Sequence, residues 1–192
     1  MGIETIINDN NGEYILINGI LTGQTPKFLP IFDKIIDQFD TIIEIGTGRG
    51  GLTSYIFNKK KIGSKLMSFD IKDRKNIKTI VNEECFIIGD CFNQQNKKSI
   101  IETITSNGKV LLLCDGGNKE KEFNTFKDHL KINDVIMLHD FSADGEEYKK
   151  YQSDNNWVTN SESHLRNINT NGLKKFMFDE FKSVFWGCFK KL

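Results

Sequence analysis

The stretch that most constrains the fold is residues 41–53, where a buried strand passes through a glycine-rich turn into a helix. Thr41–Ile45 is a short β-branched run, which is typical of a strand buried on both faces. A cluster of glycines follows it within six residues, at Gly46, Gly48, Gly50 and Gly51. Glycine lets the backbone turn tightly and lets a ligand lie against it. A strand, such a turn and a helix are how a doubly wound α/β domain begins a nucleotide site.

One carboxylate lies inside this strand. Glu44 is flanked by isoleucines, where an unpaired charge would be costly. We therefore expect Glu44 to reach the end of the strand and to accept hydrogen bonds there. The turn alone is a weak signal, because many glycine-rich turns bind nothing, and that structural alternative stays open at this point.

The rest of the chain alternates strands with helices, which predicts a Rossmann-like, doubly wound α/β sheet that is mostly parallel. The strands are expected at 41–45, 65–70, 85–90, 109–115 and 134–140. Residues 109–115 are the most apolar and are expected at the centre. Near the carboxyl terminus, 174–178 and 183–189 predict an antiparallel hairpin that closes the sheet. Residues 24–192 are expected to form one domain.

The amino-terminal residues 1–23 are expected to be an irregular extension with one hairpin. Its strands are 14–17 and 20–21, joined by the Asn18-Gly19 turn signal. Thr25 and Pro26 suit the first positions of a helix, and apolar residues at helical spacing predict one amphipathic helix from there to Phe39. Residues 142–172 are polar, with a short helix expected near 146–151, and could be a lid or a plain excursion.

Acidic residues stand at or near the ends of all five predicted strands. They are Glu44, Asp70, Asp90, Asp115 and Asp140. Ligands of such sheets bind outside the carboxyl ends of the strands, so these acids predict a polar cleft along one edge. Asp70 lies about twenty residues after the glycines, where such folds bind a ribose hydroxyl pair. A helix cap is the alternative role for Asp70.

Composition excludes several classes of function. Of the 192 residues, 26 are basic and 26 acidic, and this zero net charge argues against a binder of long nucleic acid or of a membrane surface. No run approaches the roughly 18 apolar residues of a membrane span, and the first residues do not resemble a secretory signal. The cysteines form no CxxC pair, which predicts a reducing, cytoplasmic setting. They are Cys85, Cys91, Cys114 and Cys188.

The residues at these strand ends resemble those of class I S-adenosylmethionine-dependent methyltransferases. The run from Glu44 to Gly50 looks like the first motif of that family, and Asp70 matches its ribose-binding acid. Gly89-Asp90-Cys91 looks like its adenine-contacting segment, and the family adds a terminal hairpin like the one expected here. The resemblance implies S-adenosylmethionine as the cofactor. The implied binding residues are Glu44, Gly46, Thr47, Gly48, Gly50, Asp70, Gly89, Asp90, Cys91 and Asp115.

A narrower resemblance is to the cephalosporin hydroxylase and rhamnosyl O-methyltransferase group, through residues 23–26, 43–51 and two strand-end acids. That group holds a divalent cation with acids after the fourth and fifth strands, which implies Asp115, Asp140 and His139 as ligands of Mg²⁺ or Mn²⁺. The chain departs from the group in having His139 where an acid is usual, and Gly116-Gly117 where a polar residue and a histidine are usual. An imidazole suits Mn, Fe or Zn better than Mg²⁺.

The expected function is methylation of a hydroxyl on a small molecule or a sugar, with Asp115, Asp140 and His139 at the reaction centre and His139 as the natural base. Both His139 and Asp140 can reach one site only if the chain bends after Leu138. A nicotinamide-dependent oxidoreductase is the alternative, because Gly46 begins a literal G-x-G-x-x-G spacing. A non-catalytic nucleotide-binding module is the third reading. The amino-terminal hairpin is a candidate interface for a homo-oligomer.

Overall fold

The computed structural model describes residues 1–7, 13–74, 85–142, 146, 149, 163–164 and 167–192. Its centre is a seven-stranded sheet in the order β11-β12-β8-β7-β4-β5-β6. The strands are β4 (Thr41–Ile45), β5 (Lys65–Asp70), β6 (Phe86–Ile88), β7 (Val110–Cys114), β8 (Val135–His139), β11 (Leu173–Lys175) and β12 (Trp186–Lys191). Strands β4 to β8 are parallel, whereas β12 is antiparallel to β8 and β11. The predicted fold class is confirmed, and the most apolar strand, β7, is central.

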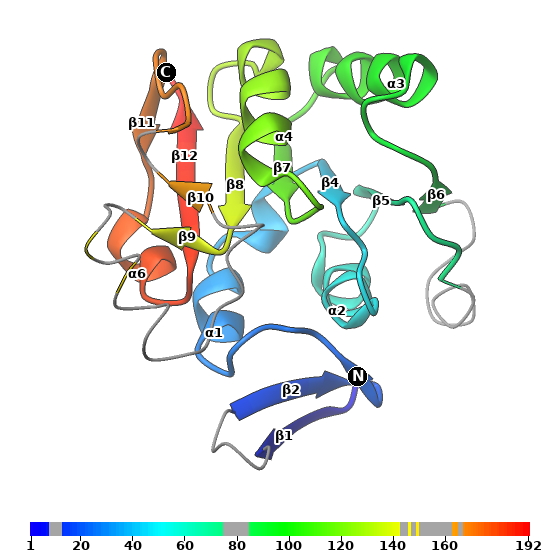
Figure 1. The fold of residues 1–192 in the computed structure, drawn as a ribbon. Coiled ribbons are helices and arrows are strands. Elements are labelled where there is room, and N and C mark those ends of the chain that lie inside the picture. Colours follow the sequence, from blue (N-terminus) through cyan, green and yellow to red (C-terminus); the bar gives the residue numbers. More distant parts are fainter. Residues whose placement is uncertain (8–12, 75–84, 143–145, 147–148, 150–162, 165–166) are drawn as a thin grey trace.

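Helices cover both faces of this sheet (Figure 1). The main ones are α2 (Gly51–Lys59), α3 (Gln94–Thr105) and α4 (Lys119–Phe126). Successive side chains of a strand point to opposite faces. Leu111 and Leu113 of β7 are therefore buried with α2, whereas Leu112 is buried with α3 and α4. One hydrophobic layer on each face of the sheet holds the carboxyl ends of the strands in fixed positions.

The amino-terminal residues form a separate three-stranded sheet of β1 (Ile3–Ile7), β2 (Glu13–Ile17) and β3 (Ile20–Leu21). The expected hairpin is present, and both turn residues have positive φ angles, 51° at Asn18 and 79° at Gly19. Strand β1 was not expected from the sequence. Ile15 and Ile17 of β2 are buried in the same hydrophobic cluster as α2, so the hairpin packs against the main sheet's helical layer. The boundary between residues 23 and 24 stays a prediction.

The single helix expected up to Phe39 is wrong. The chain forms a five-residue helix, α1 (Phe28–Phe32), and a separate 3₁₀ turn, η1 (Ile36–Gln38). After α1 the Lys34 N–H bonds to Ile31, three residues back, and Ile35 leaves the helical region with φ −124°. Thr25 does not cap the helix: the N-cap position is Lys27, and the buried Thr25 hydroxyl has no hydrogen-bond partner among the described residues.

The carboxyl-terminal hairpin of β11 and β12 is confirmed, but its first strand ends at Lys175 rather than at Phe178. Phe178 begins a short helix, α6 (Phe178–Lys182), in which the apolar side chains of Phe178 and Phe181 are buried at helical spacing. Two further strands, β9 (Phe141–Ser142) and β10 (Ser163–His164), pair in parallel, and a 3₁₀ turn, η3 (Lys127–His129), follows α4. Most of the segment considered as a lid lies outside the described residues.

Within the described part of the chain, no helix is long and apolar enough to cross a membrane.

Candidate functional site

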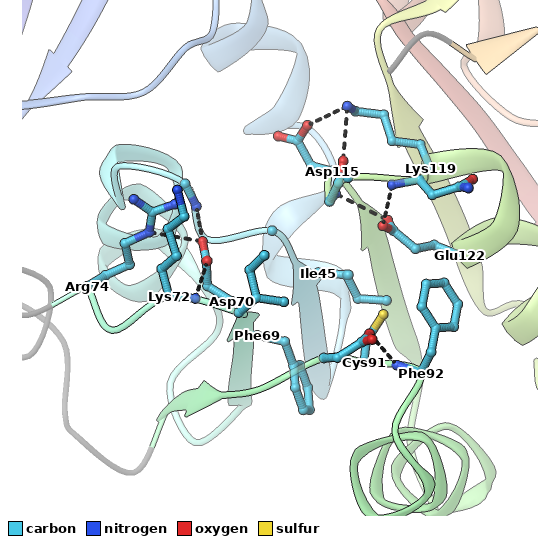
Figure 2. A pocket seen from close by; sticks show the side chains of 17 residues that line it. Ile45, Phe69, Asp70, Lys72, Arg74, Cys91, Phe92, Asp115, Lys119 and Glu122 are labelled. Carbon is cyan, nitrogen blue, oxygen red and sulfur yellow. Dashed lines mark hydrogen bonds and ion pairs between the residues drawn. The ribbon is translucent and has the colours of Figure 1, made fainter. Parts of the chain in front are cut away.

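A cavity of about 540 Å³ opens at the carboxyl ends of β4, β5 and β7 (Figure 2). Gly46 and Gly48 of the glycine-rich turn form one side of it, and Asp70 at the end of β5 forms another. Asp90 and Asp115 also lie in its wall. Three of the five strand-end acids, Asp70, Asp90 and Asp115, therefore meet at one cavity with the turn that follows Glu44, in line with the polar cleft predicted from the sequence.

The glycine-rich turn is held against the turn after β7. Gly46 has φ +94°, and a Cβ atom there would lie 2.1 Å from the carbonyl oxygen of Asp115. Only glycine fits this close approach of two backbones. Gly48 has φ +58°, and its N–H donates a hydrogen bond to Asp70 Oδ2 at 2.9 Å. The turn thus links the ends of β4, β5 and β7.

Asp70 is only 7% exposed and points towards the cavity wall formed by the turn. Its carboxylate accepts hydrogen bonds from the backbone N–H groups of Gly48 and Lys72, both at 2.9 Å. Arg74 Nε contacts Asp70 Oδ2 at 3.1 Å, and Figure 2 shows this guanidinium beside the carboxylate. Sequence reasoning did not find Arg74, although its spacing of four residues from Asp70 was visible.

The segment after β6 forms the opposite wall. Asp90 Oδ1 accepts the N–H of Phe92 at 2.9 Å, which shapes a turn that presents Cys91 and Phe92 to the cavity. Burial raises the pKa of Cys91 to about 12. The thiol is therefore protonated at neutral pH and contributes apolar surface to the cavity wall, not a nucleophile. Two glycines of the predicted set, Gly50 and Gly89, are in neither cavity wall. Each allows a backbone turn, with φ +90° and +148°.

A second cavity, of about 410 Å³, lies on the other side of the glycine-rich turn. It shares Gly46, Gly48 and Asp115 with the first cavity, so the two are neighbours across that turn. Its remaining wall comes from the amino-terminal hairpin and the residues just after it, from β4 and the glycine-rich turn, from the start of α2 and from the end of β8. These residues are Tyr14, Leu21, Thr22, Gly23, Gln24, Glu44, Thr47, Arg49, Leu52 and His139.

Glu44 is 1% exposed and lies in the wall of this second cavity. Its Oε2 accepts hydrogen bonds from the hydroxyl groups of Thr53 and Ser68, as expected for an acid in an apolar strand. Its Oε1 is buried and has no hydrogen-bond partner among the described residues. Burial raises the pKa of Glu44 to about 7, although the two hydroxyl groups oppose the shift.

The ends of β7 and β8 bring together the three residues predicted as catalytic and as metal ligands. One ligand atom from each of Asp115, His139 and Asp140 lies within 4.8 Å of the others. His139 Nδ1 is 3.0 Å from Asp115 Oδ1 and 3.4 Å from Asp140 Oδ1. Asp140 has φ +52°, which is the bend after Leu138 that the sequence required. Trp186 of β12 packs on the His139 ring, with centroids 4.7 Å apart.

The charges of this cluster shift the pKa values of His139 and Asp140. Burial lowers the pKa of His139, but the charges of Asp115 and Asp140 outweigh it and hold the pKa above its ordinary value. Burial raises the pKa of Asp140, but the charges of His139 and Lys119 outweigh it and keep the pKa below its usual range. Asp140 is therefore ionised at neutral pH.

Lys119 is a second residue of the site, after Arg74, that sequence reasoning missed. It is the first residue of α4 and only 5% exposed, and its Nζ lies 2.9 Å from Asp140 Oδ2 and 3.9 Å from Asp115 Oδ1 (Figure 2 shows it beside Asp115). The available signal was its position four residues after Asp115. Because surface lysines are abundant in this chain, that spacing carried no weight without the structure.

The two cavities fit S-adenosylmethionine. The first cavity could hold a nucleoside, because its wall offers the Asp70 carboxylate to a ribose and its glycines would let a ligand approach the backbone. The second cavity offers the unpartnered Oε1 of Glu44, which could accept from an ammonium group of the ligand. A divalent cation fits less well, because the Lys119 ammonium already lies against both aspartates.

Comparison with protein families decides the class of the protein. The model of the FtsJ-like methyltransferase family matches residues 27–185. The chain belongs to this family. It is a class I S-adenosylmethionine-dependent methyltransferase. The family match therefore favours methyl transfer over the oxidoreductase alternative. Comparison with curated proteins found no match.

Several solved structures have the same fold. The apo structure of CmcI is 13% identical, covers 92% of this chain and 76% of its own, and has a TM-score of 0.64. A Staphylococcus aureus protein described as a caffeoyl-CoA O-methyltransferase is 16% identical, with coverages of 86% and 83% and a TM-score of 0.55. MycE with Mg, SAH and mycinamycin VI is 16% identical, with coverages of 87% and 49% and a TM-score of 0.51. The chain thus spans about three quarters of CmcI and half of MycE.

Proposed function

We propose that this methyltransferase methylates a hydroxyl group of a small molecule. The observation that supports the proposal most directly is the position of His139, which lies in the wall of the second cavity, next to the glycine-rich turn that both cavities share. A base and a cofactor site are thereby adjacent. The second cavity, of about 410 Å³, is of the size that small ligands occupy, roughly 300–1,000 Å³. Structural likeness to O-methyltransferases at 13–16% identity supports the fold alone.

The residues of the chain orient and deprotonate the acceptor. Asp115 accepts the Nδ1 proton of His139, which fixes the tautomer in which Nε2 carries the lone pair. Nε2 takes the hydroxyl proton of the acceptor, so the oxygen becomes nucleophilic. When bound, S-adenosylmethionine supplies the methyl group; an oxygen–carbon bond forms, the carbon–sulfur bond breaks, and S-adenosylhomocysteine leaves. Lys119 pairs with Asp140, and Asp140 in turn contacts the imidazole of His139, so these two residues help to hold the ring in position.

The metal-assisted form of this function, expected from the narrower resemblance, has one observation in its favour. The carboxylates of Asp115 and Asp140 and the imidazole of His139 are close enough to share one ion. The Lys119 ammonium opposes it, because it would lie beside the ion and repel it. We therefore derive no step through a metal. Mg is present in the MycE complex, a fact about that protein.

The proposal can be tested with S-adenosylmethionine and a panel of catechols, sugars and hydroxylated metabolites, with release of S-adenosylhomocysteine as the readout. We expect turnover with at least one hydroxyl compound. His139→Gln should lower turnover at least about a hundredfold, since a general base contributes roughly 10²–10⁴. It should leave the affinity for S-adenosylhomocysteine within about threefold. His129→Gln, a histidine outside both cavities, is the matched control.

Equal turnover in His139→Gln and wild type would remove His139 as the base. Tight binding of S-adenosylhomocysteine without turnover on the whole panel, and turnover instead on nucleic acid, would contradict the small-molecule acceptor. Binding of NAD in place of S-adenosylhomocysteine would contradict the cofactor itself.

A further inference from the structure

The acidic cluster at the ends of β7 and β8 already contains a cation. The Nζ of Lys119 ion-pairs with Asp140 at 2.9 Å and with Asp115 at 3.9 Å, and it donates a hydrogen bond to the carbonyl oxygen of Gly116 at 3.2 Å. Lysine is almost never this deeply buried unless it is paired. The ammonium is therefore part of the cluster and not a surface charge that happens to be near it.

The backbone that carries Lys119 is anchored on both sides. The side chain of Asn118 caps α4 by accepting the N–H of Lys121 at 3.0 Å. The buried carboxylate of Glu122 accepts the N–H groups of Gly116 and Asn118, both at 3.2 Å. A Cβ at Gly116 would lie 2.3 Å from Glu122, so the turn and the helix are closely packed. These contacts place the base of the Lys119 side chain in a fixed position relative to Asp115.

A divalent ion and this ammonium compete for the same oxygens. An ion bonded to Asp140 Oδ2 at about 2 Å would lie no more than about 5 Å from Nζ, which is itself 2.9 Å from that oxygen. Two positive charges at that separation repel strongly in a site with little water. The ammonium offsets one of the two carboxylate charges and a divalent metal would offset both, but holding the ammonium and the metal together would leave one excess positive charge.

We infer that Lys119 is the resident cation of this site and takes the place that a divalent metal would occupy between Asp115 and Asp140. The inference deepens the proposed function and rests on it for the role of the site, but its central statement concerns only the charges of this chain. Lys119 acts as a positioning residue, because it holds the two carboxylates that in turn orient His139. The protein is then expected to bind its cofactor and to work in the presence of a chelator.

The experiment is a titration with Mn²⁺, followed by electron paramagnetic resonance and calorimetry, on wild type, Lys119→Met and Lys97→Met. Lys97 is an exposed lysine of α3 and serves as the matched control. We expect no Mn²⁺ binding below millimolar concentrations for wild type or Lys97→Met. Lys119→Met should bind Mn²⁺ at least about tenfold more tightly, because the repelling charge is gone. Asp140→Asn in that background should abolish the gain.

The wild-type titration decides the question even if Lys119→Met does not fold. Mn²⁺ binding to wild type at micromolar concentration, lost in Asp140→Asn, would overturn the inference, because the metal would then displace the lysine. Wild type without such binding supports it. A parallel titration with S-adenosylhomocysteine in the presence of EDTA keeps the two proposals apart. Absence of cofactor binding there counts against the proposed function, whereas the Mn²⁺ result alone decides the role of Lys119.

Discussion

The ends of β5 and β7 carry the same sequence feature, an acid followed four residues later by a basic residue, with different results. At the end of β5, Asp70 pairs with Arg74, whose side chain is 33% exposed. At the end of β7, Asp115 pairs with Lys119, whose side chain is 5% exposed. An ion pair whose cation is partly exposed exchanges that cation for a ligand more readily than a pair whose cation is buried, because a buried pair is costly to break.

This difference in the burial of the basic partner suggests different roles for the two acids. Asp70 also accepts two backbone N–H groups, so its position does not depend on Arg74, and the ribose that we propose to bind there could displace the guanidinium. The charges of Asp115 and Asp140 are offset in part by Lys119, whose buried ammonium lies against both carboxylates. The first end of the sheet is therefore built for exchange of a ligand, and the second for a fixed arrangement of charges.

Glu44 shows what a buried acid does without a cation. No basic side chain contacts it among the described residues, and its folded-state pKa of about 7 lies above the ordinary value of 4.5. Between these two values the folded state binds more protons, so the free energy of unfolding falls as pH rises and levels off above pH 7. Glu44→Gln removes this penalty. The free energy of unfolding of the variant minus that of wild type should therefore be roughly 3 kcal/mol more favourable at pH 8 than at pH 4.5.

Urea denaturation of the free protein at pH 4.5, 6 and 8 measures this effect. Glu102→Gln, an exposed carboxylate of α3, is the matched control and should leave the pH dependence unchanged. If plots of the free energy of unfolding against pH are parallel for wild type and Glu44→Gln, Glu44 titrates at the same pH in the folded and the unfolded chain. The cavity would then hydrate the carboxylate.

The second prediction concerns Asp70 as the ribose acid. Asp70→Ala should weaken binding of S-adenosylhomocysteine by at least about a hundredfold, because it removes hydrogen bonds from two hydroxyl groups to a charged acceptor, worth about 1.5–3 kcal/mol each. Calorimetric titration measures the affinity, and circular dichroism checks the fold, since Asp70 also accepts the N–H groups of Gly48 and Lys72. Asp37→Ala, an exposed acid of η1, should bind like wild type. A loss below threefold in Asp70→Ala would place the ribose elsewhere.

Much of the fold and of the first cavity could be predicted because the signals are local. A β-branched run, the glycines after it and an acid at each strand end are fixed by a few adjacent residues, and β5 and the hairpin turn at Asn18 lie where they were expected. The ends of parallel strands meet at one edge, so the meeting of Asp115, His139 and Asp140 also followed from topology.

The rest depended on packing between distant segments. Periodicity alone does not show that the helix after Pro26 ends at Phe32, because the break depends on how Ile35 and Ile36 fit beneath the sheet. Spacing does not show how deeply a side chain is buried. Arg74 and Lys119 have the same spacing from an acid, yet only the structure separates a partly exposed guanidinium from a buried ammonium.

The smallest expected effect tests the exchangeable pair directly. Arg74→Ala frees the Asp70 carboxylate without removing its backbone partners, so S-adenosylhomocysteine should bind equally well or up to about threefold more tightly, because the ligand no longer has to displace a partly exposed guanidinium. Lys59→Ala, which breaks the exposed pair with Asp33, is the control and should change nothing. A loss of more than tenfold in Arg74→Ala would show that the guanidinium contacts the ligand. Both ends of the sheet would then hold a cation as part of the site, and exposure alone would not separate an exchangeable pair from a fixed one.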